Sequence, residues 1–525
     1  MTEPLRIDAD VLVIGGGLAA TWAAAGSAGA GASVVLVDKG FCGTSGVTAA
    51  AGPGHWWVAP DKREEAIEKQ LERARGLGDP AWMARVLELT WTSLPGLDRY
   101  YGFPRDETGA PRYRSMRGPE YLKAMRRVIA DLGVRILDHS PALELLLRRD
   151  GSAGGAAGVQ PQAGRAWTAR VGAVVLATGG AGFRSRLLGS HTNTGDGLLM
   201  AAEAGAGLSG MEFSTYHTVS PARSSMTRSV SYAFASYRDA AGRPIAVPAM
   251  DSTPALARAL LEGPVFCRLH RMPQHIRERL HVIQPNAELP FTRAGIDPFE
   301  DWFEVTLRGE GTIRGVGGLK VADEDCRTEV RGLYVAGDAA SREPIAGAIS
   351  GGGAQNSSWA LSSGQWAGAA AARLARAEGR RGGEIVEAIG QAGLRPRRAK
   401  GGVNAAEVVA AVQAETLPFD KAVFRTGPGL QDSLQALDGT WKAVRDHLGG
   451  EDHRARLAAR EAAAMTAAAR WITAAAFRRD ESRGLHRRED RPGEHARLAR
   501  RLTVRGLDLL QVRYDDSAQP AGAAA

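Results

Sequence analysis

The chain has 525 residues, enough for a large core and roughly two to four domains. Its three cysteines, Cys42, Cys267 and Cys326, are far apart in the sequence, which excludes a disulfide framework, a cysteine zinc site, an iron–sulfur cluster and a c-type haem. The net charge of +8 comes from basic residues interleaved with acidic ones, a distribution that argues against a nucleic-acid-binding protein. We therefore expect no metal site on this chain.

The first apolar strand leads directly into a glycine-rich turn with the spacing Gly15-x-Gly17-x-x-Ala20. Gly15 makes the tight turn, Gly17 lets the backbone approach a pyrophosphate, and the small Ala20 lets helix and strand pack closely. The next apolar strand ends on Asp38, a carboxylate placed to bind ribose hydroxyls. Together these residues predict a Rossmann-like domain that binds a dinucleotide with a free 2'-hydroxyl.

Residues 11–37 carry no charge, and a run of this length is also found in membrane spans and signal peptides. The glycines break it into strand, helix and strand. Asp8 and Asp10 stand where a signal peptide needs positive charge. We therefore expect a cytoplasmic protein without a direct membrane span.

The following region alternates between helical and strand patterns. The expected elements are helices at 61–91 and 121–131, a strand at 134–137, a hairpin of residues 143–148 and 166–171 about a loop at 150–155, and a buried strand at 173–177. That strand runs into Thr178 and Gly179, a turn that resembles the second nucleotide-facing element of large flavin-binding domains.

The composition and the secondary-structure pattern change twice in the second half of the chain. Residues 223–312 have scattered aromatics and prolines and no strand–helix rhythm, which indicates an inserted domain. The rhythm returns in a strand that ends on Asp338. From about residue 380 the chain is rich in alanine and predicted to be helical, and its last residues are small and polar, as in a disordered tail.

Several motifs now agree in order and spacing. They are Gly15 to Ala20, Asp38, Ala177-Thr-Gly-Gly180, Thr194-Gly-Asp-Gly197, Met211-Glu-Phe213, Gly332 to Asp338, and Glu481-Ser-Arg-Gly-Leu-His-Arg-Arg-Glu-Asp490. Together they resemble the flavoprotein subunit family of succinate dehydrogenase and fumarate reductase, a group that also contains L-aspartate oxidase and the adenylylsulfate reductase alpha subunit. The resembling segments span nearly the whole chain.

The resemblance implies an α/β protein with a Rossmann-like FAD-binding domain, an inserted α+β capping domain and a C-terminal helical domain. The expected boundaries are 1–222 and 313–380 for the two parts of the FAD-binding domain, 223–312 for the capping domain, 381–515 for the helical domain and 516–525 for a disordered tail. The residues expected to bind FAD are Gly15, Gly17, Ala20, Asp38, Lys39, Ser45, Thr178, Gly179, Asp196 and Asp338.

FAD is expected to be held without a covalent bond. In respiratory members of the family a histidine after the residue at the Ser45 position attaches the cofactor, and here that place is taken by Gly46. The resemblance therefore implies dissociable FAD.

The substrate residues are where the resemblance fails. The family's dicarboxylate-binding run keeps His217 but loses its glutamine and its Pro-Thr pair. A second substrate histidine aligns with Ile313 or Arg314, and a carboxylate-binding arginine aligns with Ser350. An Arg-Gly-Glu-Gly run resembling the family's proton-donor motif begins at Arg308, too late in the chain, and is interpreted as a coincidence. Succinate and fumarate are therefore not the expected substrates.

Candidate catalytic residues are His217, which can carry a proton near neutral pH, with Tyr232 and Arg238 at the entry to the capping domain and Arg314 at its exit. A packing role is the alternative for each of them. Trp56 and Trp57 follow a segment that runs near the flavin in the family, so they could wall an aromatic substrate or pack in the core.

We expect an FAD-dependent oxidoreductase that transfers a hydride between flavin N5 and a small substrate, anionic or carbonyl-conjugated. One alternative is an adenylylsulfate-reductase-like flavoprotein that works with a separate ferredoxin-type iron–sulfur partner. A second is an oxidase that returns electrons to oxygen. A third is a flavin-bearing electron-transfer subunit without its own small-molecule turnover.

Overall fold

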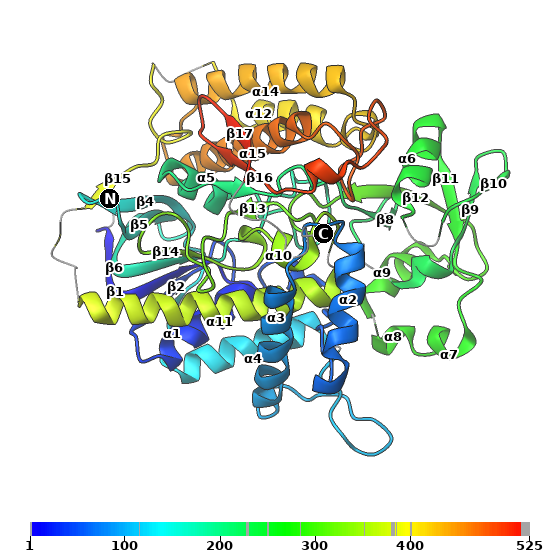
Figure 1. Ribbon diagram of the computed structural model, residues 1–525, viewed down its shortest axis with the longest axis horizontal. Helices are drawn as coiled ribbons and strands as arrows, with labels where there is room; N and C mark the ends of the chain where they lie inside the picture. The colour runs from blue at the N-terminus through cyan, green and yellow to red at the C-terminus, as the bar shows by residue number, and fades with distance from the viewer. Residues whose placement is uncertain are drawn as a thin grey trace.

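The computed structural model describes residues 3–114, 116–226, 230–248, 251–283, 285–350, 352–379, 384, 386–398 and 402–515. The expected tail at 516–525 lies outside these ranges. Figure 1 shows a sheet covered by helices on two faces, a lobe of green strands and helices to one side, and orange C-terminal helices along the top.

The main sheet has a parallel core built from buried apolar strands. Its order is β15-β4-β5-β6-β1-β2-β3, with β14 also paired to β6. The bounds are β1 (Leu5–Ile14), β2 (Val34–Val37), β3 (Arg135–Leu137), β4 (Ala142–Arg148), β5 (Ala153–Gln160), β6 (Arg165–Leu176), β14 (Leu333–Val335) and β15 (Val386–Ala388). β1 runs parallel to β2 and to β6, so its carboxyl end and theirs meet at one edge. Ligands of such sheets bind at that edge.

The helices that alternate with these strands are α1 (Leu18–Gly29), α2 (Arg63–Arg73), α3 (Pro80–Ser93), α4 (Gly118–Asp131), α5 (Asp196–Glu203), α10 (Glu343–Ala346) and α11 (Gly352–Glu378). The helical pattern at 61–91 is thus two helices. The break follows from Asp79, whose side chain caps the start of α3 by accepting from the backbone N–H groups of Ala81 and Trp82.

The predicted hairpin is also different. Residues 166–171 and 173–177 belong mostly to one long strand, β6, while the expected loop at 150–155 runs into β5. β5 is built from glycine and alanine, residues of low β propensity, because its neighbours press closely on it. A Cβ added at Gly158 would lie 2.1 Å from the carbonyl oxygen of Pro141 and 2.5 Å from the Trp167 ring.

Helices α1 and α11 cross with almost no space between their backbones. A Cβ at Gly364 would lie 2.6 Å from the carbonyl oxygen of Ala19, and one at Gly368 would lie 2.1 Å from that of Ala23. On the α1 side, Gly26 faces the carbonyl oxygen of Gln365 in the same way. Glycines therefore set the distance between these two helices.

The lobe at the side is a second sheet, here called the cap sheet, with the order β10-β9-β11-β12-β8. Its elements are β8 (His217–Pro221), β9 (Ser236–Asp239), β10 (Pro244–Ile245), β11 (Val265–Arg268), β12 (Phe303–Gly309), α6 (Thr253–Glu262), α7 (Gln274–Arg277), α8 (Leu280–Ile283) and α9 (Pro285–Ala294). It has its own hydrophobic core. Its first strand starts before residue 223, the expected boundary of the inserted domain.

The C-terminal region contains α12 (Ala405–Thr416), α13 (Phe419–Ala422), α14 (Gly427–His447), α15 (His453–Arg478), β16 (Leu502–Arg505) and β17 (Gln511–Tyr514). These two strands form a third sheet with β7 (Leu208–Ser209) and β13 (Gly318–Leu319) from earlier in the chain. A buried ion pair attaches the C-terminal region to the FAD-binding part of the chain. Arg479 lies 2.8 Å from Glu212 and 3.1 Å from Glu481, and all three side chains are fully buried.

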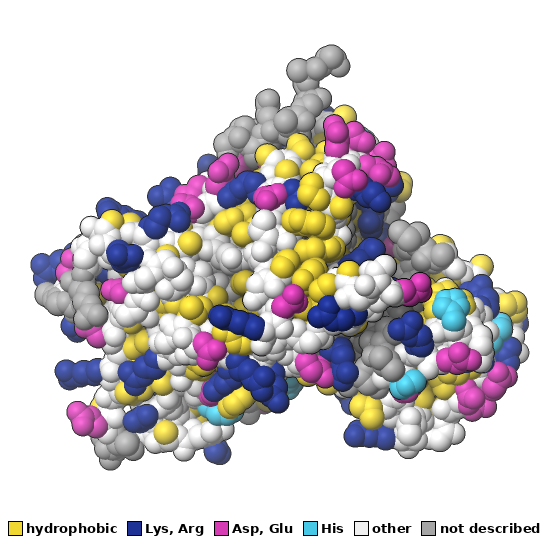
Figure 2. Space-filling model, turned by 90° about the horizontal axis from the view of Figure 1, so that it is seen from below, with side chains coloured by type: hydrophobic (Ala, Val, Ile, Leu, Met, Phe, Trp, Pro, Cys, Tyr) yellow, Lys and Arg dark blue, Asp and Glu magenta, His cyan; other side chains and the backbone are white. Residues whose placement is uncertain are grey.

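No helix in the described ranges is both long and apolar enough to cross a lipid bilayer. On the face shown in Figure 2, basic and acidic side chains are interspersed rather than gathered into one block. The net charge of +8 therefore does not form a single patch on that face.

A substitution at Gly368 tests whether the close crossing of α1 and α11 requires a glycine there. We expect Gly368→Ala to lower the free energy of unfolding by about 1–3 kcal/mol, because its methyl group would overlap a backbone oxygen. Gly439 in α14 has no atom within 4 Å of an added Cβ, so Gly439→Ala is the matched control and should be neutral or slightly stabilising. Thermal or urea unfolding of both variants checks this, and an unchanged stability of Gly368→Ala would contradict it.

Candidate functional site: a cavity at the end of the parallel strands

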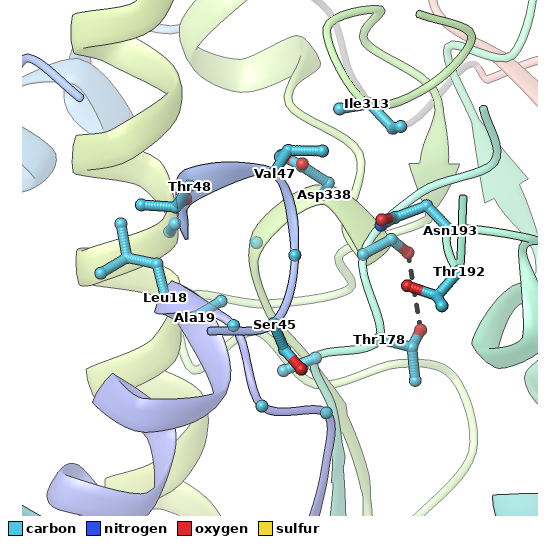
Figure 3. Close-up of a pocket in the computed structure, with 18 of the residues that line it drawn as sticks. Leu18, Ala19, Ser45, Val47, Thr48, Thr178, Thr192, Asn193, Ile313 and Asp338 are labelled. Carbon is cyan, nitrogen blue, oxygen red and sulfur yellow. Dashed lines mark hydrogen bonds between the residues drawn. The ribbon is translucent and has the colours of Figure 1, made fainter. Parts of the chain in front are cut away.

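A cavity of about 270 Å³ lies at the carboxyl ends of β1, β2, β6 and β14. Figure 3 shows its walls: Leu18 and Ala19 from the start of α1, Ser45, Val47 and Thr48 from the following loop, Thr178, Thr192 and Asn193 opposite, and Ile313 with Asp338 at one end. Of the residues expected to bind the cofactor, all line the cavity except Ala20. Ala20 is fully buried in α1.

The glycines of the first turn have different tasks. Gly15 has φ +129°, and a Cβ there would lie 2.2 Å from the carbonyl oxygen of Ala177, so no other residue fits. Gly16 faces the Asp38 carboxylate, 2.2 Å from where its Cβ would be. At Gly17 an added Cβ would meet only the carbonyl oxygen of Ser45 at 3.9 Å, so that side of the backbone is open to the cavity.

Gly17 is also the N-cap residue of α1, and no side chain caps the first backbone N–H groups of that helix. The backbone N–H groups at the start of a helix bind anions, and the helix dipole adds to that preference. The open space at Gly17 is therefore suited to a phosphate group.

Asp38 closes the other side of this turn. It is 5% exposed, and Ser45 Oγ donates a hydrogen bond to its carboxylate. Burial raises the pKa of Asp38, while the hydrogen bond from Ser45 lowers it. A carboxylate held at the end of β2 beside a glycine turn is the arrangement that accepts hydrogen bonds from ribose hydroxyls.

The wall opposite Gly17 comes from Thr178, Gly179 and Asp196. Gly179 has φ +75°, and its missing side chain makes room for Asn193, whose Nδ2 would lie 2.2 Å from an added Cβ. Asp196 is at the start of α5 and accepts hydrogen bonds from Lys39 Nζ and Thr194.

Asp338 is positioned by an arginine that the sequence patterns do not reveal. Arg342 is fully buried, and its Nη1 lies 2.5 Å from Asp338 Oδ1. Its Nη2 donates to the backbone carbonyls of Thr312, Ile313 and Gly315. Arg342 therefore connects the cavity carboxylate to the turn at 312–315, which carries two further lining residues. No sequence motif singles it out, because three of its four acceptors are backbone atoms.

Ile313 lies at the same end of the cavity as Asp338 (Figure 3), and Arg314, the next residue in the chain, also lines the cavity. The Arg314 guanidinium stacks 4.4 Å from the centre of the Tyr216 ring. Its Nε is buried and has no hydrogen-bond partner among the described residues. Asn356 Oδ1, on α11, is a second buried polar atom without a partner there. Since buried polar groups are normally paired, these two atoms of lining residues are available to a ligand in the cavity.

The other candidate catalytic residues lie elsewhere. His217 lines a separate small cavity with Phe183 and Arg425, and its Nδ1 lies 3.1 Å from the carbonyl oxygen of Thr215. Burial lowers the pKa of His217 to about 4, so its imidazole is neutral at pH 7. Tyr232 packs against the core of the cap sheet, and Arg238 stacks 4.2 Å from the Trp302 ring.

The remaining motif residues are structural. Arg308 lies on β12, donates to the carbonyls of Ala222 and Ser224, and does not line the cavity. Trp57 stacks on Trp91 with ring centres 4.2 Å apart, and neither Trp56 nor Trp57 lines the cavity. Core packing therefore accounts for these tryptophans.

Within the described ranges no cluster of His, Cys, Asp or Glu side chains is arranged to hold a metal ion. A parallel sheet, an open glycine turn at a helix start and a buried carboxylate at the end of β2 define a dinucleotide-binding protein. Two further lining residues carry partnerless polar atoms, Arg314 Nε and Asn356 Oδ1, which are available to a ligand that extends beyond the phosphate-binding turn.

Comparison with known proteins specifies the class. The model of the FAD binding domain matches residues 10–355, and that of the fumarate reductase flavoprotein C-terminal domain matches residues 414–507. One chain of the CoM/CoB fumarate reductase of Methanothermobacter marburgensis is 25% identical over 92% of this chain and 95% of its own length. L-aspartate oxidase of Mycobacterium tuberculosis is 27% identical over 96% of each chain. A mutant FrdA chain of E. coli quinol fumarate reductase superposes with a TM-score of 0.83 at 20% identity, covering 99% of this chain and 98% of that one.

The chain belongs to the FAD-binding flavoprotein family of succinate dehydrogenase and fumarate reductase, and it is an FAD-dependent oxidoreductase of that type. The cavity fits this cofactor, because the open turn at Gly17 suits its pyrophosphate and the partnerless Asn356 Oδ1 suits a ring N–H group.

The open turn predicts a clean separation of folding from cofactor binding. Because Gly17 has φ −82° and free space around its Cβ, we expect Gly17→Val to fold with nearly unchanged apoprotein stability. The added side chain would fill the phosphate space, so the variant should purify without yellow colour and show no rise in melting temperature with FAD. Flavin absorbance and thermal shift measure this, and a normally yellow Gly17→Val protein would show that the phosphate binds elsewhere.

Proposed function

We propose that this flavoprotein transfers a hydride between flavin N5 and a small anionic or carbonyl-conjugated substrate that contacts Arg314, and that the substrate is neither succinate nor fumarate. The observation that carries the proposal is the position of Arg314. It lines the cofactor cavity beside Ile313 and Asp338 and retains a buried N–H without an acceptor among the described residues.

The charge around Arg314 supports an anionic group in the substrate. Its described contact is with the face of Tyr216, and the neighbouring Arg342 is also a cation. Asp338 pairs with Arg342. A carboxylate or a polarised carbonyl oxygen would satisfy the partnerless N–H group and offset the local positive charge.

A dicarboxylate would be poorly held at the same place. The family's second substrate histidine aligns with Ile313 or Arg314, neither of which is a histidine. Ser350, at the position of the family's carboxylate-binding arginine, does not line the cavity. His217 lies in the separate cavity. Each missing charge-assisted hydrogen bond removes about 1.5–3 kcal/mol of binding.

Within this proposal Gly17 and the start of α1 hold the pyrophosphate of FAD, Asp38 holds the ribose, and Asp338 with Asn356 holds the flavin end. The bound flavin supplies the hydride chemistry. The chain supplies orientation through Arg314 and an apolar wall through Ile313, which limits water at that end of the cavity. Because neutral His217 lies outside this cavity, we do not assign it the proton.

We further propose that FAD is held without a covalent bond. The residue after Ser45 is Gly46, at φ +76°, and the lining residues of the cavity include no histidine, cysteine or tyrosine within the described part of the chain.

We expect trichloroacetic acid to release all of the flavin into the supernatant, where its absorbance is read. Flavin that precipitates with the polypeptide would show a covalent attachment. A respiratory family member with histidine-linked FAD provides the positive control for retention.

The substrate proposal is tested by anaerobic spectrophotometry of the yellow protein. We expect no bleaching of the flavin band by succinate and a response to another compound from a panel of aspartate, sulfite with AMP, and small unsaturated carbonyl compounds. With the responding compound, Arg314→Met should lower kcat/KM by about 10- to 100-fold and Arg314→Lys by less. FAD affinity should be unchanged in both variants. Rapid bleaching by succinate would contradict the proposal.

The same measurement separates the alternatives. A response only to sulfite with AMP favours a flavoprotein of the adenylylsulfate reductase type with a ferredoxin-type iron–sulfur partner in the cytoplasm. Peroxide formed during turnover in air indicates an oxidase. Flavin that is reduced by dithionite and by no compound of the panel favours an electron-transfer role.

A further inference from the structure

Lys39 is expected from sequence to bind the cofactor, and its side chain does line the cavity. Its ammonium group, however, is already surrounded. Nζ lies 2.9 Å from Thr194 Oγ1, 2.5 Å from Asp196 Oδ2 and 2.8 Å from Glu461 Oε1. An ammonium group has three N–H donors, and these contacts use all of them. Lys39 therefore has no donor left for a phosphate oxygen.

The residues that Lys39 joins come from two parts of the fold. Thr194 and Asp196 line or adjoin the cavity, and Thr194 Oγ1 donates to the second oxygen of Asp196 at 2.8 Å. Glu461 belongs to α15, in the C-terminal region, and does not line the cavity. Lys39 Nζ thus links the wall of the cavity to α15, a helix that contributes no lining residue to that cavity.

The bridge continues to a strained segment. The other oxygen of Glu461 lies 2.6 Å from Arg184 Nη2. Phe183 and Arg184 have φ +53° and +50°, values that non-glycine residues rarely adopt. Gln413 of α12 donates to the carbonyl oxygen of Phe183 at 3.0 Å. Two helices of the C-terminal region therefore hold the segment that follows the Thr178–Gly179 turn.

We propose that Lys39 is a positioning residue rather than a phosphate ligand, and that through Glu461 it couples FAD binding to the docking of α15 against the FAD-binding domain. Because coupling between two sites is reciprocal, bound FAD stabilises the docked helix as much as the docked helix favours FAD. The inference depends on the FAD site and is independent of the proposed substrate.

The charges around Lys39 predict how the effects of two substitutions on FAD affinity should combine. Without Lys39, the carboxylates of Asp196 and Glu461 would face each other without the cation that separates them, beside a site that binds a pyrophosphate. Removing the charge of Glu461 would then relieve part of the damage. A direct phosphate ligand would show no such rescue, because Glu461 does not reach the cavity.

The test is a double-mutant cycle on FAD affinity, measured by equilibrium quenching of FAD fluorescence with apoprotein. We expect Lys39→Met and Glu461→Gln each to weaken FAD binding, and the double variant to bind FAD about tenfold more tightly than additive effects predict. Lys320→Met, which removes a lysine paired with Asp515 at 2.6 Å, is the matched control and should leave FAD affinity unchanged.

Hydrogen exchange on the wild-type protein and on Glu461→Gln tests the proposal even if Lys39→Met does not fold. In the wild-type protein, FAD should slow amide exchange in the first turns of α15 and at residues 183–186, and in Glu461→Gln this protection should be lost while that of α1 persists. Additive effects in the cycle, or an FAD affinity of Glu461→Gln equal to wild type, would overturn the proposal.

Discussion

The cofactor cavity depends on the close approach of α1 and α11. Both helices begin at the cavity: Leu18 and Ala19 of α1 line it, as do Asn356 and Ser357 of α11. Their backbones can converge there only because Gly364 and Gly368 press against the carbonyl groups of α1. The start of α1, with its positive dipole end, thereby faces the cavity, and one side of the first turns of α11 lines it. The strand order places the carboxylates Asp38 and Asp338 around the same space.

Sequence alone could predict the parts of this site that are local. Gly15, Gly17 and Asp38 lie at fixed offsets in one strand–turn–helix–strand unit, so their roles follow from spacing. The residues that it missed act across long sequence distances. Gly16 makes room for Asp38, Arg342 binds carbonyls about thirty residues away, and Asn356 becomes significant only because its side-chain oxygen lacks a partner among the described residues.

The fold shows the same division. The parallel strands were recognisable from buried β-branched runs, but β5 is made of small residues and takes its conformation from the strands on both sides. For His217, sequence could single out the residue as a candidate and could not say which cavity its side chain would line. Side chains alternate along a strand, so Tyr216 contacts Arg314 while His217 faces the C-terminal helices.

Arg342 has a consequence for substitutions at positions 313 and 314. It fixes the turn at 312–315 by binding three carbonyl oxygens, and no side chain of that turn takes part. The path of the backbone at 312–315 is therefore held by contacts that do not depend on which residues occupy positions 313 and 314. Substitutions at 313 and 314 would therefore change the lining of the cavity while the course of the turn is kept.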